Sequence, residues 1–510
     1  MVGALIVMPR AVQGKTHMSD QTLLIYFVLA YLALSVGVGL YAAKRVKTTT
    51  DYVAAGRHLP LYVVTATVFA TWFGSETVLG TSATFLSEGL RGLWSDPFGA
   101  SLCLILVGLF FARPLYKMNL LTLGDFYRVR YGRTVEVLCS VAIVVSYLGW
   151  VSAQITALGL VFNILSQGLI SDQVGMLVGA GIVLGYTLFG GMWSVALTDF
   201  MQMTIIVAGL IYIAWLVAGM AGGAQVIVAH AYEAGKLDFL PQMNAKDFIA
   251  FLAAILTMGF GSIPQQDVFQ RVNSARNLPT AVAGTLLGGT GYFFFAFVPL
   301  FIAYAATLID PAMVQGFVSA RNTQHILPQL ILKHTPLFAQ VMFFGALLSA
   351  IMSTASGTLL APSVTFSENI LRSTFRGLND HQFLWMTRLV VVIFSVMVTW
   401  YSLSSNESIH RMVENAYKVT LATAFIPLVF GIYWKRASTQ GALLSIIFGL
   451  LVWVGLEIAS KASGTEGNDF FLPGHFAGML AGLLAMLIGS LIPQVYFKPN
   501  SSESSHLKLD

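Results

Sequence analysis

The stretch FATWFGSETVLG, residues 69–80, decides how the rest of this chain is interpreted. It lies within an apolar segment long enough to cross a bilayer, but small and polar residues interrupt its middle, namely Thr71, Gly74, Ser75, Glu76 and Thr77. Polar or non-helical backbone at membrane depth is tolerated only where it is buried in protein or lines a watery cavity, because unsatisfied amide groups in hydrocarbon are costly. The stretch therefore predicts a broken helix at a solute site.

The composition indicates an all-α polytopic membrane protein. Of the 510 residues, 56% are hydrophobic and only 10% are charged, whereas about a quarter of the residues of a soluble protein are charged. The net charge of +5 comes from basic residues spread over short loops, which argues against nucleic-acid binding. The chain has no nucleotide-binding loop, no zinc-ligand spacing and no Ser/His/Asp order, so we do not expect an enzyme.

Apolar windows of membrane-spanning length predict about thirteen transmembrane helices. They cover residues 22–43, 61–86, 95–116, 136–166, 174–191, 196–220, 248–269, 281–308, 338–368, 384–403, 409–433, 440–459 and 474–494. With the N-terminus outside, about two thirds of the lysines and arginines fall on the cytoplasmic side, as the positive-inside rule requires. We therefore expect a multi-pass protein of the plasma (inner) membrane, with an outer segment at 1–21 and a cytoplasmic tail at 495–510.

A second interruption, GFGSIPQQD at residues 259–267, lies five spans after the first. Two broken hydrophobic segments at corresponding positions of two halves are typical of inverted-repeat secondary transporters. The predicted core is thus a five-plus-five inverted repeat, with one five-helix repeat at 61–220 and the other at 248–433. A peripheral helix at 22–43 and two more at 440–494 lie outside this core.

The ninth span carries a third concentration of polar residues, ALLSAIMSTASG at 346–357. Ser349, Ser353, Ser356 and Gly357 recur at steps of three and four residues and so share one helical face. Small hydroxyl residues often only permit close helix packing. Na⁺, however, is a hard cation that needs several oxygen ligands, and hydroxyls together with carbonyls freed by an unwound helix can supply them.

Five segments together carry a family resemblance. The broken second span and the motifs TTTDYVAAGRHLP (48–60), YTLFGGMWSVALTDFMQ (186–202), IPQQDVFQRV (263–272) and ALLSAIMSTASG (346–357) occur in an order and spacing similar to those of the sodium/solute symporter family. The resemblance covers residues 22–460. It implies a five-plus-five inverted-repeat core and uptake of a small solute coupled to Na⁺ entry.

The resemblance also implies two ion sites. The main Na⁺ site would use the carbonyls of Ala70, Phe73 and Ala350 and the hydroxyls of Ser353 and Thr354. A second Na⁺, held by some members of the family, would use Asp199 with Ser353 and Ser356. Gly357 stands where those members often have another hydroxyl, which weakens the expectation of a second ion.

Within the family, LVGLFFARPL (106–115) and GWVSAQITALG (149–159) resemble the high-affinity choline transporter branch. A quaternary ammonium has no hydrogen-bond donor, so its site needs aromatic faces. Trp72 and Trp150 match two tryptophans of that branch's cage, whereas Ala100 and Gln265 replace a tyrosine and a third tryptophan. The candidate solute-binding residues are Trp72, Glu76, Trp150, Gln265 and Gln266.

Glu76 supplies a carboxylate about one helical turn from Trp72. It could pair with a cationic solute, bind a proton, or form a structural salt bridge with a basic residue of another span. Asp267 could reach the cavity or pair with Arg271 at i, i+4.

The sequence favours a Na⁺-coupled symporter that imports a small organic solute by alternating access. The solute could be an organic cation or amine such as choline, an amino acid such as proline, or a small carboxylate. The alternatives are a proton-coupled carrier that uses Glu76 or Asp199, and a solute sensor of the same fold that does not transport. Na⁺ is the expected coupling ion, and the expected partners are the solute and the lipid bilayer, with no nucleic acid and no obligate protein partner.

Overall fold

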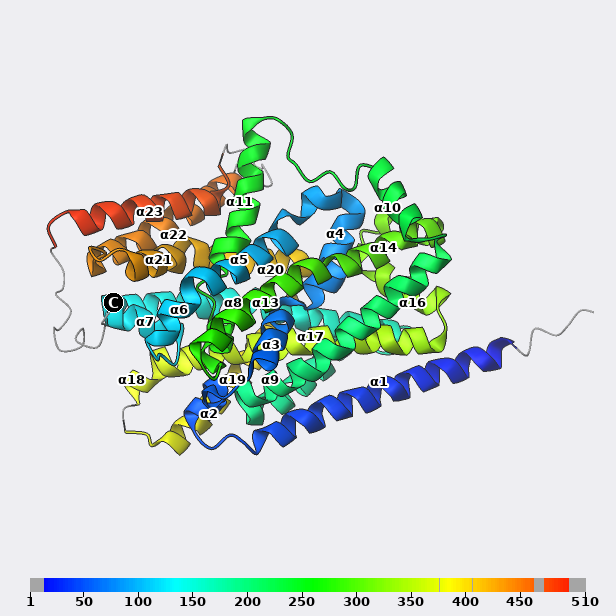
Figure 1. The fold of residues 1–510 in the computed structure, drawn as a ribbon, viewed down its shortest axis with the longest axis horizontal. Coiled ribbons are helices and arrows are strands. Elements are labelled where there is room, and N and C mark those ends of the chain that lie inside the picture. Colours follow the sequence, from blue (N-terminus) through cyan, green and yellow to red (C-terminus); the bar gives the residue numbers. More distant parts are fainter. Residues whose placement is uncertain (1–12, 376, 406, 463–471, 495–510) are drawn as a thin grey trace, which may run out of the picture.

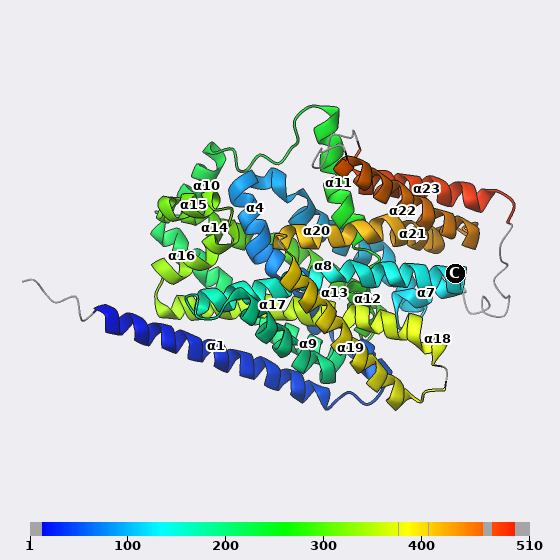
Figure 2. The ribbon, with the colours of Figure 1, turned by 180° about the vertical axis from the view of Figure 1, so that it is seen from behind.

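The structure, a computed structural model, describes residues 13–375, 377–405, 407–462 and 472–494. Most of the predicted outer segment at 1–21 and all of the predicted tail at 495–510 lie outside the described residues. Within them the chain is helical, and its one isolated β-bridge joins Leu59 and Ala275 in parallel. The fold confirms the all-α polytopic class (Figures 1 and 2).

Most of the helices form the bundle. They are α1 (Gln13–Ala43), α3 (Leu61–Trp72), α4 (Thr81–Glu88), α5 (Ala100–Leu106), α8 (Arg133–Leu165), α9 (Asp172–Met220), α11 (Ala245–Gly261), α12 (Gln266–Ser274), α13 (Leu278–Phe295), α14 (Phe297–Ile309), α17 (Leu337–Phe366), α19 (Asp380–Ser404), α20 (Ile409–Thr420), α21 (Ile426–Tyr433), α22 (Thr439–Ala462) and α23 (Gly474–Leu491).

The remaining helices have ten residues or fewer. They are α2 (Thr49–Ala54), α6 (Ala112–Lys117), α7 (Leu123–Tyr131), α10 (Ala224–Glu233), α15 (Pro311–Ser319), α16 (Ile326–His334) and α18 (Arg372–Thr374).

Ten helical runs in the described chain are long and apolar enough to cross a membrane, and the bent pair of α11 and α12 makes eleven. The predicted count of about thirteen differs because two runs each cover more than one predicted span. Residues 76–117 form one run although Asp96 within it is not helical, and α9 continues for 49 residues through a kink at Gly191, where φ is 49°. A count by length and composition alone does not separate two helices that follow each other across such a short kink.

The first predicted interruption is a true helix break. α3 ends at Trp72, and Phe73 leaves the helical region with φ −76° and ψ 73°. The amide of Gly74 donates to the carbonyl of Trp72 at 2.8 Å, and helical geometry resumes at Glu76. Gly74 and the polar residues beside it therefore mark the place where the span turns.

The second interruption is also observed. α11 ends at Gly261, α12 begins at Gln266, and the two axes differ by 48°. Pro264 lies in the gap, and proline disfavours helical geometry at the residue before it and removes one backbone donor. The sequence signal at 259–267 thus located this bend correctly.

The first broken helix lies in the middle of the bundle. In both views α3, α8, α9, α13 and α17 occupy the centre, whereas α1 runs along one edge and α22 and α23 along the opposite edge (Figures 1 and 2). Apolar side chains on the outer helices face outward, among them Leu389, Ile393 and Trp400 on α19. Such an apolar outer surface suits lipid rather than water.

Glycines allow α13 to approach the first broken helix closely. A Cβ at Gly284 would lie 2.6 Å from Cγ1 of Val64, and a Cβ at Gly288 would lie 2.7 Å from Cγ1 of Val68. Small residues at helix contacts are the usual means of close approach between membrane helices. This contact holds α3 in place up to the break.

We expect the variant Gly288→Ala to be less stable than the wild type by about 1–3 kcal/mol, because the added methyl group overpacks the contact with Val68. Gly291→Ala is the matched control on the same helix, since a Cβ there would meet only Cδ2 of Phe69, at 3.9 Å. The measurement is the midpoint of thermal unfolding in detergent. Equal midpoints for the two variants would contradict this account of the α3–α13 contact.

Candidate functional site

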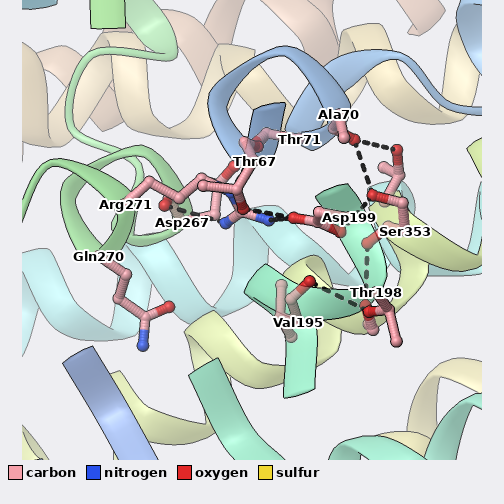
Figure 3. A network of polar contacts seen from close by, with 12 residues as sticks. Thr67, Ala70, Thr71, Val195, Thr198, Asp199, Asp267, Gln270, Arg271 and Ser353 are labelled. Atoms are coloured by element: carbon pink, nitrogen blue, oxygen red, sulfur yellow. Dashed lines mark hydrogen bonds and ion pairs between the residues drawn. The ribbon is translucent and has the colours of Figure 1, made fainter. Parts of the chain in front are cut away.

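The site begins at the carbonyl of Ala70, near the end of α3. The hydroxyl oxygens of Ser353 and Thr354 lie 3.2 and 3.3 Å from this oxygen. Both hydroxyls belong to α17, so the break in α3 and the hydroxyl face of α17 meet directly (Figure 3). Three of the five predicted Na⁺ ligands are thereby brought together.

The other two predicted ligands lie close to these three along the chain. Phe73 is in the break itself, and Ala350 precedes Ser353 by one helical turn on α17; both side chains are fully buried. Among the described residues, no group of three or more His, Cys, Asp or Glu side chains could hold a metal ion. An ion at the break would therefore be held mainly by hydroxyl and carbonyl oxygens.

Gly74 leaves room for several polar groups at the break. A Cβ on this residue would lie 2.6 Å from Oγ1 of Thr354, 2.9 Å from Oε1 of Gln154 and 2.9 Å from Oε2 of Glu76. The carboxylate of Glu76 and the hydroxyl of Thr354 therefore border the same small space. Any larger residue at position 74 would displace one of them.

Glu76 is buried and hydrogen-bonded to two side chains of α8. The indole of Trp150 donates to Oε1 at 3.1 Å, and the amide of Gln154 donates to Oε2 at 2.7 Å. The carbonyl of Gln154 accepts from the backbone amide of Ser75 at 3.0 Å. Within the described chain Glu76 makes no ion pair with a lysine or arginine, so the structural salt bridge considered for it is not observed.

An aromatic cluster, defined here as Trp72, Tyr147, Trp150 and Tyr417, surrounds this carboxylate. The ring centroids of Trp72 and Trp150 are 6.2 Å apart, and Tyr417 on α20 lies 6.3 Å from the first and 5.5 Å from the second. Tyr147 stacks on Trp150 at 5.8 Å. All four side chains are fully buried. The two predicted tryptophans thus contact each other edge to face, at an interplanar angle of 64°, and two tyrosines complete the group.

Asp267, the second residue of α12, adjoins the aromatic cluster from the second break. The indole of Trp72 donates to its Oδ2 at 3.3 Å, and the hydroxyl of Tyr147 donates to its Oδ1. Arg271 does not pair with this carboxylate: its Nη1 donates to the backbone carbonyl of Asp267 at 3.1 Å. The hydrogen bonds of the Asp267 carboxylate thus come from the aromatic cluster, and the predicted i, i+4 ion pair with Arg271 is not observed among the described residues.

The two predicted glutamines point in different directions. Gln265 donates to the hydroxyls of Ser146 at 3.1 Å and Thr420 at 3.3 Å, on the helices that carry Trp150 and Tyr417. Gln266 instead accepts from the backbone amide of Leu123 at 2.8 Å, at the start of α7. Gln265 thus lies near the aromatic cluster, whereas the side chain of Gln266 is hydrogen-bonded to the start of α7.

Asp199 lies on α9 beside the Ala70 carbonyl. It accepts hydrogen bonds from the hydroxyls of Ser353, at 2.5 Å, and Thr67. The guanidinium of Arg271 forms an ion pair with it, with Nη2 at 3.6 Å from Oδ2 (Figure 3). Ser356, predicted as a partner in a second ion site, donates instead to the backbone carbonyl of Ser353 at 2.9 Å.

Sequence reasoning missed several residues of the site, namely Thr67, Asp96, Tyr147, Gln154, Tyr292 and Tyr417. Gln154 lies one turn after Trp150 on the same helix, a spacing that could have drawn attention to it. Asp96 is 3% exposed and accepts from the hydroxyl of Tyr292 at 2.5 Å, and that hydroxyl lies 2.9 Å from Thr77. No local signal connects these distant residues.

Residues 52–449 match the model of the sodium:solute symporter family, and the chain belongs to this family. It is thus a multi-pass membrane transport protein and not an enzyme.

The chain is similar to a high-affinity choline transporter from Torpedo marmorata, with 29% identity over 84% of this chain and 75% of that protein. It is 26% identical to the human high-affinity choline transporter, over 84% of this chain and 76% of that one. It is also 26% identical to an osmoregulated proline transporter from Bacillus subtilis strain 168, over 91% and 93% of the two chains.

Among solved structures, a Na⁺-coupled sialic acid symporter in an outward-open state has the same fold. The TM-score is 0.75 at 21% identity, and the match covers 92% of this chain and 97% of that one. A transporter of the nucleobase-cation-symport-1 family in a closed conformation matches with a TM-score of 0.57 at 15% identity, over 89% and 98% of the two chains. The fold is therefore that of known secondary transporters.

The contact between Glu76 and Gln154 can be tested by exchanging the carboxylate and the amide between the two positions. Gln154→Glu alone places a second carboxylate beside Glu76, and we expect it to lower the thermal midpoint of unfolding in detergent. Adding Glu76→Gln restores one carboxylate and one amide in the same contact. We expect the double variant to recover stability, with a coupling of about 0.5–3 kcal/mol between the two positions.

The single variant Glu76→Gln is measured alongside to complete the cycle. If the effects of the two substitutions simply add, the two side chains are not partners and the geometry described for Glu76 is wrong.

Proposed function

We propose that this protein is a Na⁺-coupled symporter that imports a small organic cation by alternating access. Its N-terminus would lie outside and its C-terminus in the cytoplasm, with the two five-helix repeats moving relative to each other around the broken helices. Family membership supports transport, and the residues at the first break support both the ion and the class of solute.

The proposed Na⁺ site consists of the carbonyls of Ala70, Phe73 and Ala350 and the hydroxyls of Ser353 and Thr354. The two hydroxyls already lie 3.2 and 3.3 Å from the Ala70 oxygen, so three oxygens converge on one place. Neutral oxygen ligands such as carbonyls and hydroxyls suit Na⁺, because it is a hard cation that carries only a single charge. The carboxylate of Glu76, across Gly74, adds negative charge next to this site.

The single observation that carries the choice of solute is the aromatic cluster with its two carboxylates. The indoles of Trp72 and Trp150 donate to Asp267 and Glu76, and neither carboxylate has a lysine or arginine as side-chain partner in the described chain. Aromatic faces attract cations, most strongly when water is excluded. Buried carboxylates without a counterion add to that attraction.

An amino acid such as proline fits these residues less well. Its carboxylate would need a cationic or N–H partner at the site, and in the described chain the one guanidinium close by, that of Arg271, is already paired with Asp199. We therefore favour choline or another amine over an amino acid.

Ion and solute would be coupled through the break itself. Ala70 belongs to the proposed Na⁺ site, Trp72 to the aromatic cluster, and Glu76 borders both, all within one segment of the chain. An ion that fixes the break would pre-order the solute site. By linkage the solute then raises the affinity for Na⁺ by the same factor.

The first test is uptake of radiolabelled choline into right-side-out vesicles. We expect uptake to need an inward Na⁺ gradient, and the double variant Ser353→Ala, Thr354→Ala to raise the half-saturating Na⁺ concentration by about tenfold or more, since losing about 1.4 kcal/mol of ion binding has that effect. Ser363→Ala is the matched control, because that buried hydroxyl on the same helix donates only to the carbonyl of Leu359, at 2.8 Å.

Two outcomes would contradict this assignment. An unchanged Na⁺ requirement in the double variant would remove the hydroxyls from the ion site. Uptake driven by a pH gradient in Na⁺-free buffer would replace Na⁺ by a proton as the coupling ion.

The second test addresses the solute by thermal shift of the purified protein in Na⁺. A ligand at about 100 times its Kd stabilises the folded state by about 2.7 kcal/mol. We expect choline to raise the midpoint, and Trp72→Ala to abolish this shift while keeping the shift caused by Na⁺, which shows that the variant is folded. Trp215→Ala is the control, since Trp215 is 71% exposed on the outer surface.

A shift with proline that choline does not give, or a choline shift that survives in Trp72→Ala, would contradict the proposed solute site.

A further inference from the structure

Arg271 is the one arginine of the described chain that is both fully enclosed and placed at the site. Its side chain is 1% exposed. Nε donates to the carbonyl of Thr67 at 3.0 Å, Nη1 to the carbonyl of Asp267 at 3.1 Å, and Nη2 lies 3.6 Å from Oδ2 of Asp199. The guanidinium thus joins α12 to α3 and α9 (Figure 3).

Asp199 needs such a counterion. Its side chain is 0% exposed, and the hydroxyls of Thr67 and Ser353 that donate to it are neutral. A buried carboxylate without a positive partner is strongly destabilising, whereas a paired one with further hydrogen bonds is tolerated. Either a bound cation or a fixed basic side chain can meet this need.

The surroundings of Gly357 favour a basic side chain, and not a bound cation, as the partner of Asp199 in this chain. A Cβ at this position would collide with Nη2 of Arg271, so the guanidinium occupies the space that any side chain at 357 would fill. A hydroxyl ligand for a second ion cannot be placed at 357 while Arg271 is there. The hydroxyl of Ser356 is directed to the carbonyl of Ser353 at 2.9 Å.

We propose that the guanidinium of Arg271 takes the place of a second Na⁺ as the permanent counterion of Asp199, so that the chain binds a single Na⁺. The inference deepens the proposed function and rests on it. A guanidinium is always charged and remains attached to the protein. Its charge therefore does not cross the membrane with the solute, and one Na⁺ accompanies each solute molecule.

Arg271 also acts as a positioning residue for the first ion. It fixes Asp199, Asp199 accepts from the hydroxyl of Ser353 at 2.5 Å, and the same hydroxyl lies 3.2 Å from the Ala70 carbonyl. The ion pair thus sets the orientation of a ligand of the proposed Na⁺ site without touching the ion.

The test counts bound ²²Na⁺ at saturation on the purified full-length protein, in detergent and without solute. We expect one ion per wild-type chain, with a Hill coefficient of one. The variant Arg271→Gln removes the positively charged partner of Asp199. The double variant Arg271→Gln with Gly357→Ser also adds a hydroxyl that can serve as a ligand for a second ion. We expect two ions in the double variant, and two in Arg271→Gln if Asp199 and Ser353 suffice as ligands.

Two controls complete the design. Arg271→Gln with Asp199→Asn removes both charges and should bind one ion. Arg276→Gln removes an exposed arginine from the connection that follows α12 and should also bind one. A Na⁺-dependent thermal shift in each variant shows that it is folded.

Two ions on the wild-type chain would overturn the inference and leave Na⁺ coupling intact. A count of one in both Arg271→Gln and its double variant with Gly357→Ser, with both proteins folded, would overturn it as well. No bound ion on the wild type would overturn Na⁺ coupling and the inference together.

Discussion

The carbonyl of Ala70 is the group on which the rest of the site depends. Breaking a helix at membrane depth leaves backbone groups without partners, and each must be satisfied inside the protein. Here the hydroxyls of Ser353 and Thr354 approach that oxygen at 3.2 and 3.3 Å, which brings α17 against the end of α3. The packing of the bundle and the candidate ion site thus have the same physical origin.

Buried charge is the second constraint. Four buried carboxylates belong to or contact residues 67–77, and in the described chain Arg271 is the one basic side chain paired with any of them. They are Glu76, Asp96, Asp199 and Asp267. Carboxyl groups beside aromatic faces suit a cationic ligand better than an anionic one, which is consistent with the proposed organic cation and Na⁺.

The order of the helices and the two breaks could be predicted because each depends on residues close together in the chain. Apolar runs give the spans, Gly74 with its polar neighbours gives the first break, and Pro264 gives the second. The thirteen predicted spans differ from the ten or eleven observed runs where a short kink, as at Asp96 and Gly191, lies within one run. Composition does not distinguish such a break from a continuous helix.

By itself the sequence determined the class of protein, the broken helices and the hydroxyl face of the ninth span, since these follow from hydrophobicity and from periodicity along one helix. Only the tertiary structure decided the partners. Glu76 contacts Trp150 and Gln154, 74 and 78 residues away, and Arg271 contacts Asp199 rather than Asp267 four residues before it. Periodicity specifies which residues share a face, but the residue opposite that face is set by the packing of helices distant in the chain.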